Sequence, residues 1–363
     1  MSTTTPADLP RPIKMAILDD YQNFSAPYFQ HFPASELEIT TYTDTLSPHT
    51  NLPALIARLQ PYAIISTMRE RTPFPAALTQ QLPRLRLLLT TGSRNNAFDL
   101  PALAARRIPV AGTPSDVSAA LAPPRGFSKT TQHAWALLLA LSNNVARDDA
   151  GLRGGSGGAW QDAFPLNVYL AGKTFGALGL GKLGVAAAKI AVLGFGMRVV
   201  AWSASLTQEE ADRRAEEAGL PRGSFAVAAG KEGLLREADV LSLHYVLSER
   251  SRGIVGAEEL KLLKREALLV NTARGPLVDE DALFECLERG AIRGAALDVF
   301  WEEPLPAESR WRTTRWGEDG RSQVLLTPHT GYMFEETIDL WWKETAANVR
   351  RWLDGEELTN RMV

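Results

Sequence analysis

Three glycines between a strand-like segment and a helix-like segment constrain this chain more than any other feature. The apolar run Thr174 to Leu180 leads into Gly179, Gly181 and Gly184, and the residues that follow have the composition of a helix. In that setting the first glycine permits a tight turn, the second lets backbone approach a pyrophosphate, and the third allows close packing of helix on sheet. The pattern predicts dinucleotide binding, and a glycine turn without a ligand is the alternative. The residues expected to hold the dinucleotide here are Gly179, Gly181, Lys182, Leu183 and Gly184.

The end of the next strand-like run bears on which dinucleotide fits. A carboxylate about 20 residues after the glycine motif commonly binds the adenosine ribose of NAD. The segment Val200 to Ser205 contains none, and the first acid is Glu209. Loss of the acid removes repulsion against a 2′-phosphate, and Ser203 or Ser205 can donate hydrogen bonds to either cofactor. We expect NAD or NADP with a slight lean towards NADP tolerance, and a plain exposed loop is the alternative.

Short apolar runs alternate with helix-like stretches on both sides of a break near residue 120. This alternation is typical of an α/β fold, so we expect two Rossmann-like domains, each with a doubly wound parallel sheet. Helices are expected from about Thr130 to Val145 and from Phe334 to Leu353, the second with Trp341, Trp342 and Trp352 available for burial. The expected strands are 14–20, 62–67, 85–92 and 109–112 before the break, and 174–180, 198–203, 240–245, 267–273, 295–300 and 324–327 after it.

Composition argues against several classes of partner. The formal net charge of -3 supplies no basic field to attract nucleic acid or anionic lipid. No apolar run reaches the ~20 residues that span a bilayer, and Met1 to Pro12 lacks the features of a signal peptide. The only cysteine, Cys286, can form neither an internal disulfide nor a multi-cysteine metal site, and we expect a buried, inert thiol. We therefore expect a soluble, cytoplasmic protein with no nucleic-acid partner, no membrane partner and no metal.

Three polar residues each follow a separate strand-like run in the second half of the chain: Arg274, Glu303 and His329. Ligands of open α/β sheets bind at the carboxyl ends of the strands. An imidazole can carry a proton at neutral pH, and a guanidinium can engage a carboxylate with two parallel hydrogen bonds. A carboxylate beside a histidine fixes its tautomer and favours the imidazolium. We expect these three side chains to form a catalytic group at the edge of the sheet where the strands end. A structural histidine and an ordinary Arg–Glu salt bridge are the alternatives.

Together with the glycine turn, the segments Val270 to Gly275, Ala295 to Pro304 and Thr327 to Gly331 resemble the D-isomer-specific 2-hydroxyacid dehydrogenases. That family contains D-lactate, phosphoglycerate, glyoxylate/hydroxypyruvate and formate dehydrogenases. The likeness covers nearly the whole chain and is strongest from Thr174 to Tyr332. It implies NAD(P)-dependent interconversion of a small 2-keto acid and a D-2-hydroxy acid. It also implies Arg274 as anchor of the substrate carboxylate and carbonyl, His329 as general acid/base, and Glu303 as the partner of His329.

The resemblance also implies a domain arrangement in which a nucleotide domain is inserted in a discontinuous substrate domain. The expected parts are a first substrate segment at 1–118, with a disordered tail at 1–12, then a dinucleotide-binding domain at 119–332. The last segment, 333–363, is expected to return to the substrate domain. Because the family is commonly dimeric, with long helices such as Thr130 to Val145 at the contact, we expect a homodimer.

Further site residues follow from the same resemblance. Arg69 and Arg94 lie in loops that face the substrate in the family, although solvated surface arginines are the alternative for both. His244 is expected on the cofactor side, and a packed structural histidine is the alternative. The expected substrate-binding residues are Arg69, Thr91, Gly92, Ser93, Arg94 and Arg274. The further expected cofactor-binding residues are Ser203, His244, Tyr245, Thr272, Ala273, Asp298 and Gly331.

Several segments depart from the common family pattern. Val246 replaces a proline often found two residues after a histidine such as His244, and the missing acid near Ser203 leaves the NAD preference open. The stretch Asp116 to Lys129 is longer than the family suggests and is interpreted as a disordered or mobile hinge flap. The loop Arg310 to Arg321 either covers the cleft that the resemblance implies between the two domains, or packs on the surface or on a partner subunit.

Two other functions remain open from the sequence. One is a non-enzymatic, dinucleotide-sensing interaction protein, like the transcriptional corepressors of this family. The other is a formate dehydrogenase. Retention of the arginine, glutamate and histidine favours an enzyme over the corepressor-like function.

Overall fold

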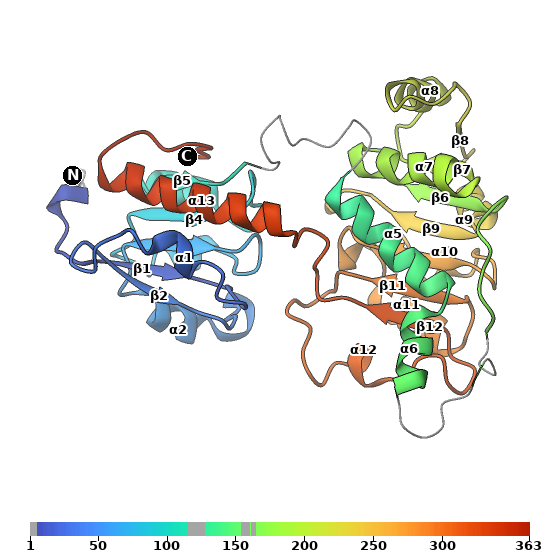
Figure 1. Cartoon of the computed structure of the whole chain (residues 1–363), viewed down its shortest axis with the longest axis horizontal. Coiled ribbons are helices and arrows are strands. Elements are labelled where there is room, and N and C mark those ends of the chain that lie inside the picture. Colours follow the sequence, from blue (N-terminus) through green and yellow to red (C-terminus); the bar gives the residue numbers. More distant parts are fainter. Residues whose placement is uncertain (1–5, 115–127, 154–159, 161–164) are drawn as a thin grey trace. The chain divides into compact units, whose positions relative to one another are not determined.

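The computed structural model describes residues 6–114, 128–153, 160 and 165–363. The described residues form two compact units, one from within 1–122 together with 333–363, and one from within 123–332. Each unit has a parallel β-sheet with helices packed on it (Figure 1). The boundary expected between residues 118 and 119, the glycine-rich loop 154–158 and most of 116–129 lie outside the described residues.

The first unit is built on a five-stranded sheet of order β2-β1-β3-β4-β5, and every neighbouring pair is parallel. The interior strands β3 and β4 are buried along their whole length because helices cover the sheet. The strands are β1 (Ile13–Ile17), β2 (Leu37–Thr41), β3 (Ile64–Thr67), β4 (Leu87–Thr90) and β5 (Val110–Ala111). The helices are α1 (Ala26–Phe29), α2 (Pro48–Leu59), α3 (Ala76–Thr79), α4 (Leu100–Ala105) and α13 (Glu335–Leu353).

Helix α13 completes the first unit from the far end of the chain. Its three predicted tryptophans, Trp341, Trp342 and Trp352, are all buried, as the amphipathic pattern predicted. Of the tail expected at 1–12, the structure describes residues 6–12, and there Pro6–Asp8 forms a short 3₁₀ helix that contacts α13. Arg11 adds a surface ion pair to Glu36 at 3.2 Å.

The second unit is built on a seven-stranded parallel sheet of order β12-β11-β10-β9-β6-β7-β8. Its first strand, β6, lies between β7 and β9, so the chain reverses its winding direction there. The strands are β6 (Thr174–Leu178), β7 (Arg198–Trp202), β8 (Phe225–Val227), β9 (Val240–Leu243), β10 (Leu268–Asn271), β11 (Gly294–Leu297) and β12 (Gln323–Leu326). The helices are α5 (Lys129–Ser142), α6 (Val145–Arg153), α7 (Lys182–Phe195), α8 (Gln208–Glu217), α9 (Lys231–Glu237), α10 (Ala257–Leu260), α11 (Glu280–Glu288) and α12 (Arg310–Thr313), with a 3₁₀ turn at Gly275–Leu277.

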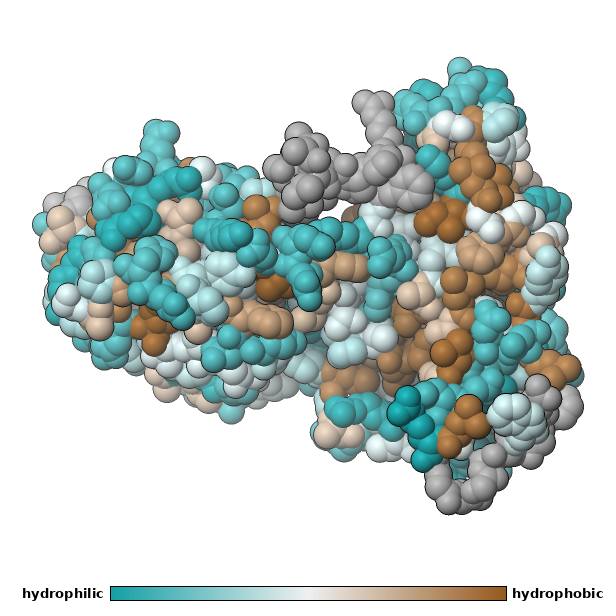
Figure 2. Space-filling view, viewed as in Figure 1, coloured by the Kyte–Doolittle hydropathy of each residue, from teal (hydrophilic) through white to brown (hydrophobic). Residues whose placement is uncertain are grey.

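Both units carry mainly polar surfaces, and both also expose some apolar side chains, such as Phe24 in the first unit and Leu193 in the second. Figure 2 shows apolar residues interspersed with polar ones over the visible face of the second unit. Among the described helices, none is both long and apolar enough to cross a membrane. The exposed large apolar residues between 145 and 169 are Val145, Leu152, Trp160, Leu166 and Tyr169.

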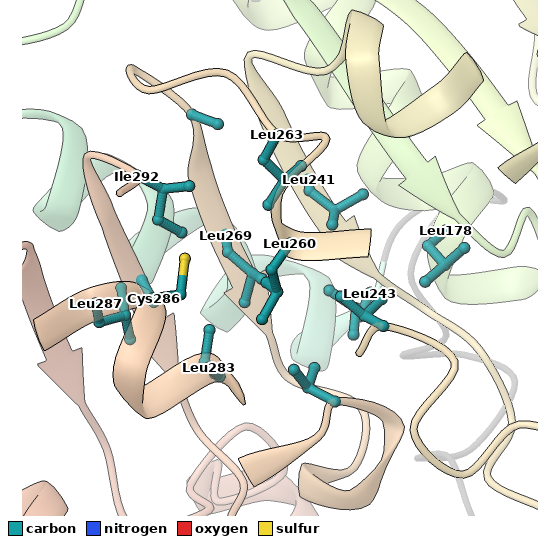
Figure 3. Close-up of a cluster of buried hydrophobic side chains, with 14 of the residues drawn as sticks. Leu178, Leu241, Leu243, Leu260, Leu263, Leu269, Leu283, Cys286, Leu287 and Ile292 are labelled. Carbon is teal, nitrogen blue, oxygen red and sulfur yellow. The ribbon is translucent and has the colours of Figure 1, made fainter. Parts of the chain in front are cut away.

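Cys286 lies in the core of the second unit. Figure 3 shows its sulfur among Leu283, Leu287 and Ile292, in a cluster of buried leucines that packs on the sheet. Burial raises the pKa of the thiol to about 11, so the thiolate is not populated at neutral pH. The expectation of a buried, inert cysteine is confirmed.

The structure adds detail for two parts of the chain that the sequence left undefined. Strands β2 and β8 were not predicted; both lie at sheet edges with one neighbour each, and their partial burial leaves a weak apolar pattern. The loop Arg310 to Arg321 packs on its own unit, because Trp311 is buried and stacks on Trp301 with ring centroids 5.3 Å apart.

Candidate active site

The glycine turn follows β6 at the point where the winding of the second sheet reverses. Gly179 adopts a φ of +98°, and a Cβ there would lie 2.8 Å from the carbonyl oxygen of His244. A Cβ on Gly184 would overlap the carbonyl oxygen of Gly179, so only glycine permits this approach of helix to turn. Gly181 begins α7 without a side-chain cap and faces open space. The turn and its neighbours Lys182 and Leu183 therefore fit the pyrophosphate of a dinucleotide.

The end of β7 lies beside this turn, since the amide of Gly179 donates to the carbonyl oxygen of Trp202 at 2.9 Å. Ser203 follows immediately. The hydroxyl of Tyr245 accepts a hydrogen bond from the amide of Ala204 at 3.2 Å, and its ring stacks on Trp202. The structure thus brings the predicted cofactor residues Ser203 and Tyr245 to the same edge as the glycine turn.

Helix α8 supplies a cation that the sequence reasoning missed. Arg214, in the last turn of α8, donates a hydrogen bond to the carbonyl oxygen of Leu180. A cavity of about 380 Å³ lies between the start of α7 and the second half of α8. This volume is within the size range of ligand pockets. Its lining residues are Leu180, Gly181, Lys182, Val185, Arg213, Arg214, Glu217 and Ala218.

His244 is enclosed behind the glycine turn and is hydrogen-bonded to a residue of its own strand. Its Nε2 lies 2.9 Å from the hydroxyl of Ser242. Enclosure of the imidazole lowers the pKa of His244 to about 4, although the residue as a whole keeps some exposed surface. The ring is therefore neutral at neutral pH, and its backbone carbonyl forms the wall behind Gly179.

Arg274 follows β10 in a turn fixed by Asn271. The side chain of Asn271 accepts from the amide of Ala273 and donates to the carbonyl oxygen of Arg274, both at 3.0 Å. The Arg274 Nη1 donates to the carbonyl oxygen of Ala273 at 2.7 Å. A Cβ on the next residue, Gly275, would overlap the backbone of Phe300, so the turn that contains Thr272 to Arg274 packs against the chain after β11.

Glu303 and His329 meet at the carboxyl ends of β11 and β12. The Glu303 Oε2 lies 2.6 Å from the Nδ1 of His329, and the other carboxylate oxygen accepts from the amide of Phe300 at 2.9 Å. Both side chains are about one-fifth exposed, at 22% and 21%. Tyr332 presents its ring at an edge-on angle to the imidazole, with centroids 5.8 Å apart. The sequence-predicted pair is therefore in contact.

Asp298 lies at the end of β11 behind this pair. Burial by itself raises the pKa of the carboxyl, but hydrogen bonds from His133, Thr327 and the amide of Thr330 outweigh it, so the pKa lies below its ordinary value. The Oδ2 accepts from the amide of Gly331 at 3.0 Å. The predicted cofactor residues Asp298 and Gly331 thus contact each other, and His133 is a neighbour that the sequence reasoning did not identify.

The predicted substrate loops of the first unit also lie together. The amide of Arg69 donates to the hydroxyl of Thr91 at 3.0 Å, and a Cβ on Gly92 would overlap the Arg69 guanidinium. That guanidinium lies over the ring of Trp341, 5.8 Å from its centroid, and 3.5 Å from the carboxylate of Glu70. Ser93 and Arg94 are exposed at the surface of the same loop.

Comparison with known proteins decides the family. The family model described as D-isomer specific 2-hydroxyacid dehydrogenase, NAD binding domain, matches residues 135–331. The chain belongs to this family. It is 36% identical to a glyoxylate reductase of Aeropyrum pernix over 72% of this chain and 71% of the relative. It is 34% identical to a glyoxylate reductase of Thermococcus litoralis over 77% of each chain.

Solved structures agree with the sequence comparison. The structure of a phosphoglycerate oxidoreductase from Vibrio cholerae matches with a TM-score of 0.76 and 30% identity. The match covers 94% of the present chain and 99% of the Vibrio chain. The predicted family and the predicted α/β fold with Rossmann-like domains are confirmed. The expectation that the chain uses NAD or NADP is confirmed as well, and the corepressor-like alternative is not favoured.

Proposed function

We propose that glyoxylate and close 2-keto acids are substrates of this chain, an NAD(P)-dependent oxidoreductase that interconverts 2-keto and 2-hydroxy acids. The names of the Aeropyrum and Thermococcus relatives support the substrate class. The observation that carries the proposal is the contact of 2.6 Å between Glu303 and His329. This pair lies at the end of the same sheet that precedes the glycine turn and Arg274. D stereochemistry of the hydroxy acid is proposed from family membership.

His329 is proposed as the general acid/base. The carboxylate of Glu303 only accepts hydrogen bonds, so the Nδ1 of His329 must carry the hydrogen between them. The other ring nitrogen, Nε2, is then the atom that can give a proton to a carbonyl oxygen or take one from a hydroxyl. Glu303 fixes the ring orientation and stabilises the positive charge when both nitrogens are protonated. Bound NAD(P)H supplies the hydride for the 2-carbon.

Arg274 is proposed to bind the substrate carboxylate and to stabilise charge that develops on the neighbouring oxygen. Its turn is rigid because Asn271 bonds to it on two sides and Gly275 packs against Phe300. A cation held in place in this way needs no reorganisation during the reaction. Its effect should therefore be larger on turnover than on substrate binding.

The loops of the first unit are proposed to bind the rest of the substrate. The amide of Gly92 already donates to the hydroxyl of Thr113 at 2.7 Å. We therefore assign contacts to the residues after it, Ser93 and Arg94, and to the guanidinium of Arg69. Because Arg69 is held against Trp341, its position changes little when an anion binds.

NADP is the proposed preference between the two cofactors. No acid follows β7, and Ser203 offers a hydroxyl where an acid would repel a 2′-phosphate. Arg214 adds a cation next to the glycine turn, where it donates to the carbonyl oxygen of Leu180. Tighter binding of NADH than of NADPH in a fluorescence titration would contradict this preference.

A homodimer is proposed, with the exposed apolar side chains of the described residues Val145, Leu152, Trp160, Leu166 and Tyr169 at the contact. Leu152, Leu166 and Tyr169 are 64%, 66% and 82% exposed in the described chain, an unfavourable arrangement for large apolar side chains in water. A second copy of the chain is the proposed occupant. A cytoplasmic location is proposed as well, because the only cysteine is reduced and buried.

A panel of 2-keto acids with both reduced cofactors tests the proposed function. The panel contains glyoxylate, hydroxypyruvate, pyruvate, phenylpyruvate and 2-ketoisocaproate, and the readout is the loss of NAD(P)H absorbance. We expect turnover with glyoxylate or hydroxypyruvate. Silence with every acid would contradict the proposal, and reduction of NAD by formate would instead support a formate dehydrogenase.

A further inference from the structure

His133 links the first helix of the second unit to the loop that carries His329. It lies on α5, and its Nε2 is 3.1 Å from the Oδ1 of Asp298 and 3.2 Å from the hydroxyl oxygen of Thr327. The side chain of Asp298 is 2% exposed, and that of His133 is 17% exposed. The contact spans 165 residues of sequence and does not include the reacting pair itself.

The hydrogen bonds around Asp298 determine that the Nε2 of His133 carries a hydrogen. Asp298 Oδ1 accepts from the hydroxyl of Thr327 at 2.6 Å and from the amide of Thr330 at 2.8 Å, while Oδ2 accepts from the amide of Gly331. Since Thr327 donates its only hydroxyl hydrogen to Asp298, it can only accept from His133. The Nε2 of His133 must therefore carry a hydrogen, shared between Asp298 and Thr327. With this fourth donor, the carboxylate reaches its capacity of about four hydrogen bonds.

The residues that Asp298 holds lie on both sides of His329. Thr327 precedes it by two positions, and Thr330 and Gly331 follow it directly. His329 has a φ of +53°, a left-handed conformation that residues other than glycine rarely adopt and that persists only where the surroundings hold it. A Cβ on Gly331 would lie 3.0 Å from Asp298 and 3.3 Å from the His133 ring, so the loop is also packed closely against this pair.

We propose that His133, acting with Asp298, is a positioning residue that holds His329 in the conformation in which its Nδ1 meets Glu303. The proposal rests on the proposed role of His329 as general acid/base. The N–H of His133 keeps Asp298 oriented, and Asp298 in turn fixes the backbone before and after His329. Loss of that N–H leaves a buried carboxylate one donor short, and the carboxylate then turns away from Thr330 and Gly331.

Three substitutions of His133 test this. A glutamine places an amide N–H near the position of Nε2, whereas an asparagine is too short and a leucine has no donor. We expect His133→Leu and His133→Asn to lower kcat about ten- to hundred-fold, the effect of one lost hydrogen bond to a charged group that is felt at the reacting histidine. KM for the keto acid should stay unchanged. His133→Gln should recover most of kcat.

Trp135→Phe is the matched control on the same helix. Its indole N–H donates to the carbonyl oxygen of Ala187 at 3.3 Å, away from the His329 loop. This variant should lower the melting temperature without lowering kcat. A loss of kcat in the His133 variants that merely follows the loss of melting temperature, as in Trp135→Phe, would overturn the proposal.

Other results of these experiments also test the proposal. Wild-type kcat in a folded His133→Leu protein would overturn the proposal, as would equal losses in the glutamine and asparagine variants. If the leucine variant does not fold, the comparison of glutamine with asparagine is sufficient. Full activity of His329→Asn would instead contradict the proposed function itself, so the two failures are distinguishable.

Discussion

At the scale of single residues, two histidines of the second unit have opposite environments. His329 is partly exposed and bonded to a carboxylate, which suits a group that exchanges protons with a substrate. His244 is enclosed, with a hydroxyl as its partner, and burial lowers its pKa to about 4. The sequence alone left a structural alternative open for both histidines, because both follow strand-like runs and their three-dimensional neighbours are not visible in it.

The lowered pKa of His244 predicts a loss of stability in mild acid. The unfolded chain binds a proton at this histidine near its ordinary pKa of about 6.5, whereas the folded chain binds it only near 4. The stability that the neutral His244 contributes to the folded chain is therefore complete above about pH 6.5, and it declines as the pH falls towards 4. Between pH 7 and pH 5 we expect a loss of about 2 kcal/mol in the free energy of unfolding.

Urea unfolding at the two pH values measures this loss. The matched variant is His244→Gln, which keeps a polar group beside Ser242 but cannot titrate. The decline from pH 7 to pH 5 should be about 2 kcal/mol smaller in the variant than in the wild type. An identical decline in both proteins would show that His244 does not take up a proton on unfolding in this range.

At the scale of secondary-structure elements, the turn between β6 and α7 offers two glycines with different surroundings. A Cβ on Gly184 would overlap backbone of Gly179, whereas a Cβ on Gly181 would meet no atom within 4 Å. Gly184→Ala should therefore destabilise the fold by about 1–3 kcal/mol. Gly181→Ala should leave stability intact and weaken dinucleotide binding, because it adds a methyl group where the pyrophosphate approaches.

Thermal melts and fluorescence titration with NADH and NADPH separate these two effects. The expected result is a lower melting temperature for Gly184→Ala and an unchanged one for Gly181→Ala, with weaker binding in the second. Undiminished binding of both cofactors by the folded Gly181→Ala protein would place the pyrophosphate elsewhere.

The sequence predicted most elements because the buried parallel strands are continuous apolar runs bounded by helices. It missed β2, in which only Leu37 is buried, and β8, which is only three residues long. Near the glycine turn, it singled out Arg274, Glu303 and His329 because each lies in the loop that follows a buried strand. It missed His133 and Arg214, which lie inside helices and reach the site only through tertiary packing, 165 residues from Asp298 and 34 from Leu180.

At the scale of the whole molecule, the exposed apolar residues at 145–169 predict self-association. Leu152→Glu and Tyr169→Glu place charges on the proposed contact and should convert a dimer to a monomer at micromolar concentration. Leu193→Glu is the control, because Leu193 is 63% exposed on α7 outside this surface. Sedimentation velocity distinguishes the two states, and a monomeric wild-type protein would reject the proposed dimer.

The central claim is that His329 transfers the proton in a hydride-transfer reaction on a 2-keto acid. The most direct measurement is single-turnover oxidation of bound NAD(P)H by the best keto acid of the panel, in the wild type and in His329→Asn. The account predicts that the variant is slower by about 10² to 10⁴ while its cofactor affinity is retained. Equal rates in the two proteins would contradict it.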